Sequence, residues 1–133
     1  MAELSDRQRG ILSGKNFYTV STIGRDGSPR STTIWGDLEG DEVTVNTREG
    51  RGWLANIRRD PRVAIAVHDA EDPYAQVSLR GRVVEVTSEG AQAHIDALSR
   101  KYTGHDYGVQ PDQVRVRVRI SLESARSWGV DLS

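Results

Sequence analysis

The chain has 133 residues, a mass of 14.7 kDa and a formal net charge of −1, with 36% hydrophobic and 28% charged residues. These values are typical of a globular protein, so we expect a single domain over residues 1–133. A net charge near zero and an aromatic content of 6% argue against a nucleic-acid-binding barrel, which relies on a basic groove and stacking platforms. No apolar run approaches the ~20 residues of a membrane helix, and the N-terminus has no hydrophobic signal segment, so we expect a cytoplasmic protein without a membrane partner.

The absence of cysteine excludes disulfides, thiolate metal sites and cysteine nucleophiles. His68, His94 and His105 share no ligand spacing, so they are expected to be surface or hydrogen-bonded histidines, and no metal site is predicted. No constellation of general acid and base residues stands out either. That absence is compatible with a bound cofactor that performs the chemistry itself while the protein binds and orients it.

In the N-terminal third, Ser5 and Gln8 fit a capping box for a short helix that ends at Gly14. β-forming residues then predict strands at 17–23 and 30–35, separated by a turn at 24–29. Alternation at residues 43–47 predicts a third strand, and the three strands are expected to form a meander.

Further along, residues 50–59 have helical spacing and precede Asp60-Pro61, which should end a short helix. The apolar run at 63–67 predicts a buried strand, and residues 74–87 predict a long strand with a bulge or a sharp bend at Gly81. Ser88 is the expected cap of a helix that ends at Gly104.

Valines and arginines alternate from Val114 to Ile120, which predicts a half-buried last strand with a basic outer face, followed by a tail. The expected fold is therefore mainly β, a closed or nearly closed six-stranded barrel with peripheral helices.

The stretch from Thr47 to Arg62 combines a strand end with a hydroxyl, a turn containing Gly50 and Gly52, and a helix start. Residues 48–62 contain five arginines against Glu49 and Asp60. Such a segment supplies the positive charge and the backbone N–H groups that a phosphate needs. The alternative is a solvated face whose arginines pack along their stems, and charge alone does not separate the two.

Several segments, in matching order from about Leu4 to Trp128, resemble the pyridoxamine-phosphate-oxidase-like split barrels. The similarity is closest to the branch of small deazaflavin-dependent reductases. It is carried by Asp26-Gly27-Ser28-Pro29, the Thr47 turn, residues 56–63, residues 78–83, and Arg100-Lys101-Tyr102.

The resemblance implies a split barrel of the FMN-binding type. It also implies a homodimer that binds two cofactors at the subunit interface. The implied cofactor is coenzyme F420, with FMN as the alternative. The implied reaction is hydride transfer from reduced F420 to a conjugated, electron-poor small molecule such as a quinone, an enone or a tetrapyrrole. An FMN-dependent oxidoreductase, or a non-catalytic flavin- or haem-binding protein on the same barrel, remains open.

By the same resemblance, Thr47, Arg51 and Gly52 face the cofactor phosphate, Asn56 braces that turn, and residues 31–35 lie beside the ring. The family often has a lysine three residues before the asparagine, where this chain has Trp53, which would pack or stack instead. The candidate cofactor-binding residues are Ser31, Thr33, Trp35, Thr47, Arg48, Arg51, Gly52, Trp53, Asn56, Arg58, Gln76 and Ser78.

Some of these candidates have more specific expected roles. Arg51 or Arg58 would compensate for the missing lysine. Gln76 and Ser78 alternate along one strand face and would reach the cofactor from the second subunit, or else are ordinary barrel positions. The arginines suited to the oligoglutamate tail of F420 are Arg48, Arg58, Arg59 and Arg80.

Overall fold

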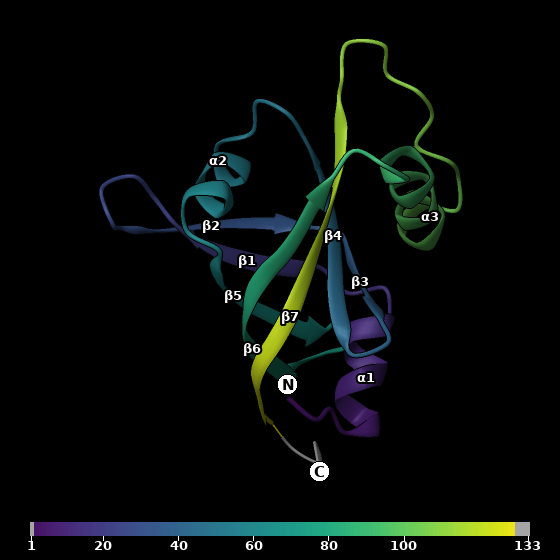
Figure 1. Cartoon of the computed structure of the whole chain (residues 1–133). Helices are drawn as coiled ribbons and strands as arrows, with labels where there is room; N and C mark the ends of the chain where they lie inside the picture. The colour runs from purple at the N-terminus through teal and green to yellow at the C-terminus, as the bar shows by residue number, and fades with distance from the viewer. Residues whose placement is uncertain (1, 130–133) are drawn as a thin grey trace.

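A computed structural model describes residues 2–129 and shows a strongly curled sheet flanked by three helices (Figure 1). The elements in chain order are α1 (Asp6–Ser13), β1 (Tyr18–Ile23), β2 (Pro29–Ile34), β3 (Gly36–Glu39), β4 (Glu42–Arg48), α2 (Gly52–Arg59), β5 (Arg62–Asp69), β6 (Asp72–Thr87), α3 (Ala91–Thr103) and β7 (Arg115–Trp128). The expectation of a mainly β fold with peripheral helices is confirmed.

All strand pairs are antiparallel, and the order in the sheet is β2-β1-β5-β6-β7-β4-β3. The predicted meander is wrong. β4 pairs with β3 and β7, whereas β2 pairs with β1 at the opposite end of the sheet. The chain also forms one strand more than expected, because residues 36–39 pair with β4 across a turn at Gly40, which has a φ of +62°.

The long strands β6 and β7 give the sheet its curl, and they cross the middle of Figure 1. Their register shifts at Arg80/Gly81 and again between Val83 and Glu85, which confirms the bulge predicted at Gly81. A Cβ atom on Gly81 would lie 2.6 Å from the Ser121 carbonyl oxygen, so only glycine fits there without a shift. The curl encloses a core of valine, leucine and isoleucine side chains that α1 closes at one end.

Most helix ends lie where the sequence predicts them. Ser5 and Gln8 form the predicted capping box of α1, and α2 ends at Asp60. The predicted Ser88 cap of α3 is wrong. The N-cap is Gly90, at a φ of +72° that glycine adopts readily, and only the main-chain oxygen of Ser88 contributes, by accepting a bond from the Ala91 N–H. Gly104 ends this helix as expected.

Two strands differ from their sequence patterns. β5 alternates buried valine and isoleucine with exposed alanine, so it is buried on one face only although all its central residues are apolar. β7 continues to Trp128 through the region expected to be a tail, because the long strand β6 pairs with residues 117–128 of β7. Its basic face is confirmed, with Arg117 and Arg119 half-buried and ion-paired to Glu39, Glu42 and Glu85.

Among residues 2–129, no helix is both long and apolar enough to cross a membrane.

Candidate functional site

A cavity of about 480 Å³ lies between β2, the end of β4, α3 and the start of β7. One part of its wall is apolar and aromatic, and the other part carries hydroxyl, amide and guanidinium groups. Its lining residues are Phe17, Thr32, Thr33, Ile34, Trp35, Asn46, Thr47, Arg51, Trp53, Ile95, Leu98, Tyr107 and Arg115.

A second cavity of about 690 Å³ continues from the first, since Thr32, Arg51 and Trp53 line both. It extends to the turn between β1 and β2, where its wall adds Gly24, Arg25, Asp26, Arg30, Ser31, Gly52 and Asn56. We call the two cavities together the groove. It runs along the edge strand β2 and passes the start of α2.

The aromatic wall of the groove is held by α3. The Tyr102 ring is stacked between Phe17, with ring centroids 5.6 Å apart, and Trp35, at 5.5 Å and an interplanar angle of 8°. The Tyr102 hydroxyl donates to the Asn16 carbonyl at 2.5 Å and accepts from the Gly36 N–H at 3.2 Å. Burial raises the pKa of Tyr102 to about 12, so the hydroxyl stays protonated and keeps these bonds at any ordinary pH.

Lys101 strengthens the same attachment. Its Nζ donates to the Gly36 carbonyl at 2.8 Å and lies 3.2 Å from the Asp37 carboxylate. Burial lowers the pKa of Lys101, whereas the nearby Asp37 raises it in part. The Lys101-Tyr102 pair therefore fixes the corner between β2 and β3, and with it the orientation of Trp35.

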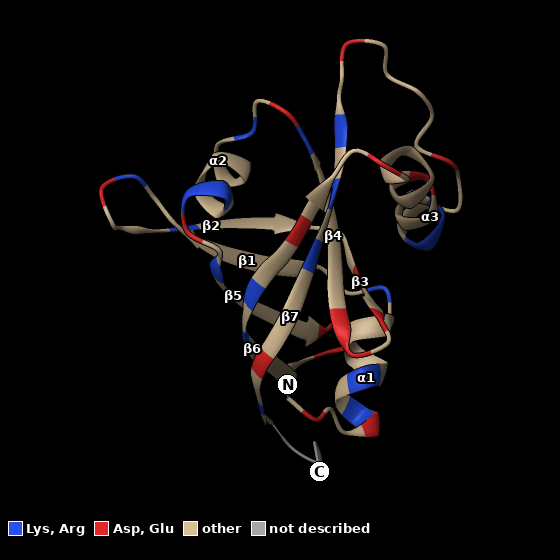
Figure 2. Ribbon diagram, viewed as in Figure 1, with Lys and Arg blue, Asp and Glu red and all other residues tan. Residues whose placement is uncertain are grey.

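The polar end of the groove is basic. Basic segments lie on the β4–α2 connection, on α2 and at the start of β7 (Figure 2). Within residues 2–129, Arg48, Arg51 and Arg115 form no ion pair with a carboxylate. Burial lowers the pKa of Arg115, and the positive charges of Arg48 and Arg51 lower it further, which places the three side chains in one electrostatic neighbourhood.

A buried amide connects this basic end to α3. Asn46 Nδ2 donates to the Ala91 carbonyl at 3.0 Å and lies 2.9 Å from His94 Nδ1, while its Oδ1 accepts from Arg115 Nε at 3.0 Å. The expectation that the histidines are at the surface or hydrogen-bonded needs correction for His94. Its Nδ1 is bonded, but its Nε2 is buried and has no partner among the described residues. Burial lowers the pKa of His94 to about 4, so the ring is neutral near pH 7.

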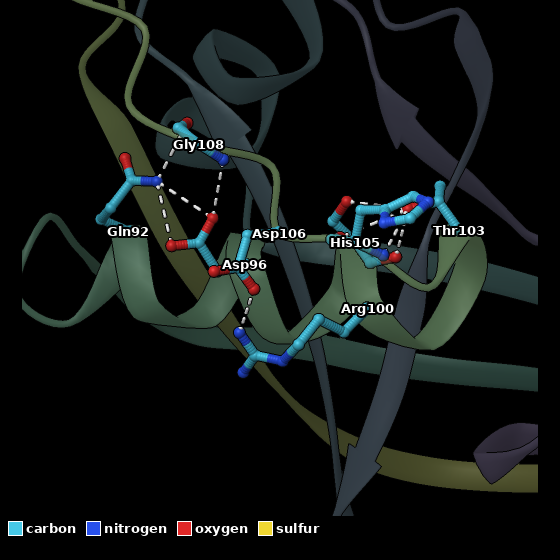
Figure 3. Close-up of polar contacts among 8 residues, drawn as sticks. Gln92, Asp96, Arg100, Thr103, His105, Asp106 and Gly108 are labelled. Atoms are coloured by element: carbon cyan, nitrogen blue, oxygen red, sulfur yellow. Dashed lines mark hydrogen bonds and ion pairs between the residues drawn. The ribbon is translucent and has the colours of Figure 1, made fainter.

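The connection between α3 and β7 brings Tyr107 to the cavity, and Figure 3 shows how this connection is held. Asp96 accepts from the Gly108 N–H at 2.9 Å, and Gln92 donates to the Gly108 carbonyl at 3.1 Å. Arg100 pairs with Asp106 at 2.5 Å. Gln92 and Asp96 thus fix the backbone at Gly108, directly after Tyr107, and Arg100 adds an exposed ion pair with the side chain of Asp106.

The structure gathers most of the predicted residues at the groove. Thr33, Trp35 and Thr47 line the first cavity, Ser31, Gly52 and Asn56 line the second, and Arg51 and Trp53 line both. Trp53, at the position of the family's lysine, is half-buried and also packs against the main core.

Four expectations differ from the geometry. Arg58 is held by Glu49 through bonds of 2.6 and 2.8 Å and lines neither cavity. Asn56 donates to Thr22 Oγ1 at 3.0 Å and accepts from Arg59, so it ties α2 to β1 instead of bracing the turn at 47–52.

The other two concern residues away from the groove wall. Arg48 is near Arg115 but does not line either cavity. Gln76 and Ser78 on β6 lie outside the groove of their own chain, as expected of residues that reach the cofactor from a second subunit, and that role stays a prediction. The proposed tail arginines are also spread apart, since Arg80 bonds Ser124 on a different part of the surface.

Sequence reasoning missed several lining residues. Most are apolar or small, and nothing in their local pattern distinguishes them from core positions. For Arg115 the sequence offers a weak signal, because this residue is the first arginine of the strand predicted from alternating valines and arginines. Thr32 and Ile34 belong to the segment 31–35 that was expected beside the ring, whereas the missed residues are Phe17, Asn46, Ile95, Leu98, Tyr107 and Arg115.

The curled antiparallel sheet, with a groove that joins an aromatic wall to Arg51 and Arg115, has the architecture of a split β-barrel. The chain belongs to the pyridoxamine 5'-phosphate oxidase family, whose model matches residues 4–129. The family resemblance and the split-barrel fold expected from the sequence are thereby confirmed.

Solved structures agree with this fold. An F420 reductase superposes with a TM-score of 0.84 at 21% identity, covering 92% of this chain and 98% of that protein. A conserved hypothetical protein of Mycobacterium tuberculosis has a TM-score of 0.74 at 25% identity, covering 98% of this chain and 88% of the other. General stress protein 26 of Bacillus anthracis has a TM-score of 0.72 at 15% identity, with 92% of each chain covered.

Proposed function

We propose that this protein is an F420-dependent oxidoreductase that transfers a hydride to a conjugated, electron-poor small molecule of the quinone, enone or tetrapyrrole class. The observation that carries the proposal is the groove itself, in which an aromatic wall at Trp35 leads to Arg51 and Arg115, whose guanidinium groups have no carboxylate partner in the described part of the chain. The membership of the chain in its family and its similarity to an F420 reductase support the same class.

The residues fit the ring of such a cofactor. Strand β2 presents Thr33 and Ser31, whose hydroxyls also bond Thr19 and Ser21 across the strand pair at 3.4 and 2.9 Å. These bonds hold the hydroxyls in place beside a planar ligand, and Trp35 closes the wall. When bound, the cofactor supplies the hydride chemistry, while the chain binds, orients and excludes water.

The residues also fit a phosphate. Arg51 is the N-cap of α2 and makes no side-chain capping bond, the first turn of α2 contains no acidic residue, and Thr47 lies in the same wall. A helix start beside a guanidinium and a hydroxyl is a favourable environment for an oxyanion. We therefore assign the phosphate to Arg51, Thr47 and Gly52.

The longer tail of F420 has a candidate surface beside this point. A shallow depression lined by Arg25, Arg51, Arg58 and Arg59 adjoins the groove. Arg58 already pairs with Glu49, and this observation favours the alternative cofactor, FMN, which has a single phosphate and no glutamates. An FMN-dependent oxidoreductase is accordingly the second candidate.

We further propose a homodimer in which the partner covers the open groove with Gln76 and Ser78. Large apolar side chains remain exposed in the single chain, with Tyr74 at 76% and Trp128 at 54% of their full exposure. Exposed aromatic residues are typical of protein interfaces. Sedimentation of a cofactor-loaded monomer at micromolar concentration would contradict the dimer.

Paired titrations test the cofactor assignment. F420, FMN and an F420 precursor without glutamates are titrated into the protein at low and high ionic strength. F420 should bind most tightly, and its advantage over the precursor should shrink with salt, because exposed tail contacts are screened over ~8–10 Å. FMN binding as tightly as F420 at low salt would favour the flavin alternative.

A further inference from the structure

The guanidinium of Arg115 is fixed within the first cavity by neutral groups alone. Its Nε donates to Asn46 Oδ1 and its Nη1 donates to Gln113 Oε1, both at 3.0 Å. The Cζ atom of Arg115 lies 5.0 Å from the centroid of the Tyr107 ring. Among residues 2–129, no carboxylate pairs with it and its Nη2 has no hydrogen-bond partner. The side chain is therefore oriented but not neutralised.

Without a ligand, the surroundings make the half-buried charge of Arg115 unfavourable in free energy. Arg115 is half-buried beside Ile95 and Leu98, and the charges of Arg48 and Arg51 repel it. The other arginines on this face of β7, Arg117 and Arg119, each have glutamate partners. A partly desolvated cation is normally stabilised by an anion, so the structure leaves a place for one.

We propose that Arg115 recognises one oxyanion, a carboxylate or a phosphate, on a planar ligand bound in the first cavity. The anion would be carried either by the cofactor or by the molecule that receives the hydride, and this part of the inference rests on the proposed function. Arg115 donates from its free Nη2, while the apolar side chains of α3 and Trp35 contact the plane of the ligand.

Asn46 and His94 act as positioning residues for Arg115. The Asn46 amide has its NH₂ directed to the Ala91 carbonyl and to neutral His94, so only its oxygen is available to Arg115. A flipped amide would place NH₂ against the guanidinium. The Ala91 carbonyl, which can only accept, fixes the amide orientation that holds Arg115 in the cavity, and His94 Nδ1 accepts from the same NH₂ group when the ring carries its proton on Nε2.

The first experiment needs no cofactor. Calorimetric titrations compare 2-naphthoate with 2-naphthamide, which differ in charge but share the ring system, on the wild type, Arg115→Gln and Arg119→Gln. Arg119 is the matched control, because it lies on the same face of β7 but is already paired with Glu42 at 2.9 Å. We expect the carboxylate to bind at least tenfold more tightly than the amide in the wild type and in Arg119→Gln, and within twofold in Arg115→Gln. Equal binding of the two ligands by the wild type would overturn the proposal.

A second variant tests the same assignment independently, in case Arg115→Gln does not fold. Asn46→Asp keeps the arginine but supplies an internal carboxylate at the position of Oδ1, so it should also lose the preference for naphthoate. Retention of that preference would overturn the assignment to Arg115. Thermal midpoints of all variants show whether each one is folded.

A third comparison identifies the carrier of the anion. Affinities of FMN against riboflavin, and of F420 against its phosphate-free riboside, are measured with Arg115→Gln. A loss confined to the phosphorylated ligands assigns the anion to the cofactor, whereas a raised KM confined to a carboxylated naphthoquinone, and absent for its amide, assigns it to the acceptor. If no flavin or deazaflavin binds the wild type, the proposed function fails, while the naphthoate comparison still decides the anion site.

Discussion

The indole of Trp35 lies almost parallel to the phenol ring of Tyr102, at an interplanar angle of 8° and a centroid distance of 5.5 Å. Trp35 follows β2, whereas Tyr102 belongs to α3, so the aromatic wall of the groove depends on how the helix is attached to the sheet. The attachment point is Gly36, whose N–H and carbonyl bond Tyr102 and Lys101.

Replacing Tyr102 by phenylalanine should destabilise the protein by about 1–3 kcal/mol, because the ring stacking is kept while the buried Gly36 N–H and Asn16 carbonyl lose their partner. Urea unfolding measures the difference. Tyr107→Phe is the control, since that hydroxyl donates to Gln113 at 3.2 Å in a partly exposed site and its loss should cost clearly less. Equal costs for the two variants would contradict this role of Tyr102.

Arg51→Ala should weaken cofactor binding about tenfold or more, which corresponds to about 1.4 kcal/mol. The thermal midpoint of the apo-protein should hardly change, because Arg51 is exposed and has no carboxylate partner among the described residues. Arg62→Ala serves as the matched control, because Asp60 already pairs with that exposed side chain at 2.7 Å and Arg62 lines neither cavity of the groove. Titrations at moderate salt with unaltered affinity in Arg51→Ala would remove it from the site.

The lowered pKa of His94 should make the free energy of unfolding of the protein depend on pH. Burial lowers its pKa to about 4 in the folded chain, below the ~6.5 of an unfolded chain, so the unfolded state binds a proton first as the pH falls. Stability from this group is complete above pH ~6.5 and falls towards pH ~4, by at most about 1.4 kcal/mol per pH unit.

His94→Gln should remove this part of the pH dependence, since glutamine does not titrate and its Oε1 can accept from Asn46 as Nδ1 does. Chemical denaturation of both proteins at several pH values between 4 and 7 gives the two slopes. A wild-type slope that persists unchanged in the variant would place the titrating group elsewhere.

Gly36→Ala should destabilise the fold by about 1–3 kcal/mol or more, because the added Cβ would lie 2.7 Å from the Tyr18 ring in the core. Gly10→Ala is the matched control in the middle of α1, where nothing lies within 4 Å, and it should stabilise by about 0.5–1 kcal/mol through helix propensity. Thermal unfolding of the two variants should therefore shift in opposite directions.

The sequence by itself determined the features that depend on neighbouring residues. The capping box of Ser5 and Gln8, the bulge at Gly81 and the stop at Gly104 were all predicted, since each one is set by the backbone preferences of a few consecutive residues. The predicted segment from Thr47 to Arg62 contributes Thr47, Arg51, Gly52, Trp53 and Asn56 to the groove, and it was recognisable because its turn, helix start and arginines are adjacent in the chain.

Only the tertiary structure decided which distant groups meet. β4 pairs with β7 instead of β2, and this pairing brings Arg115 within 3.0 Å of Asn46, a residue 69 positions earlier. His94 reaches the same amide from α3, and Arg58, expected at the cofactor, is held by Glu49 outside the groove. Such pairings follow from the curl of the sheet and from competition among nearby charges, which depend on the packing of the whole chain and leave no local sequence pattern.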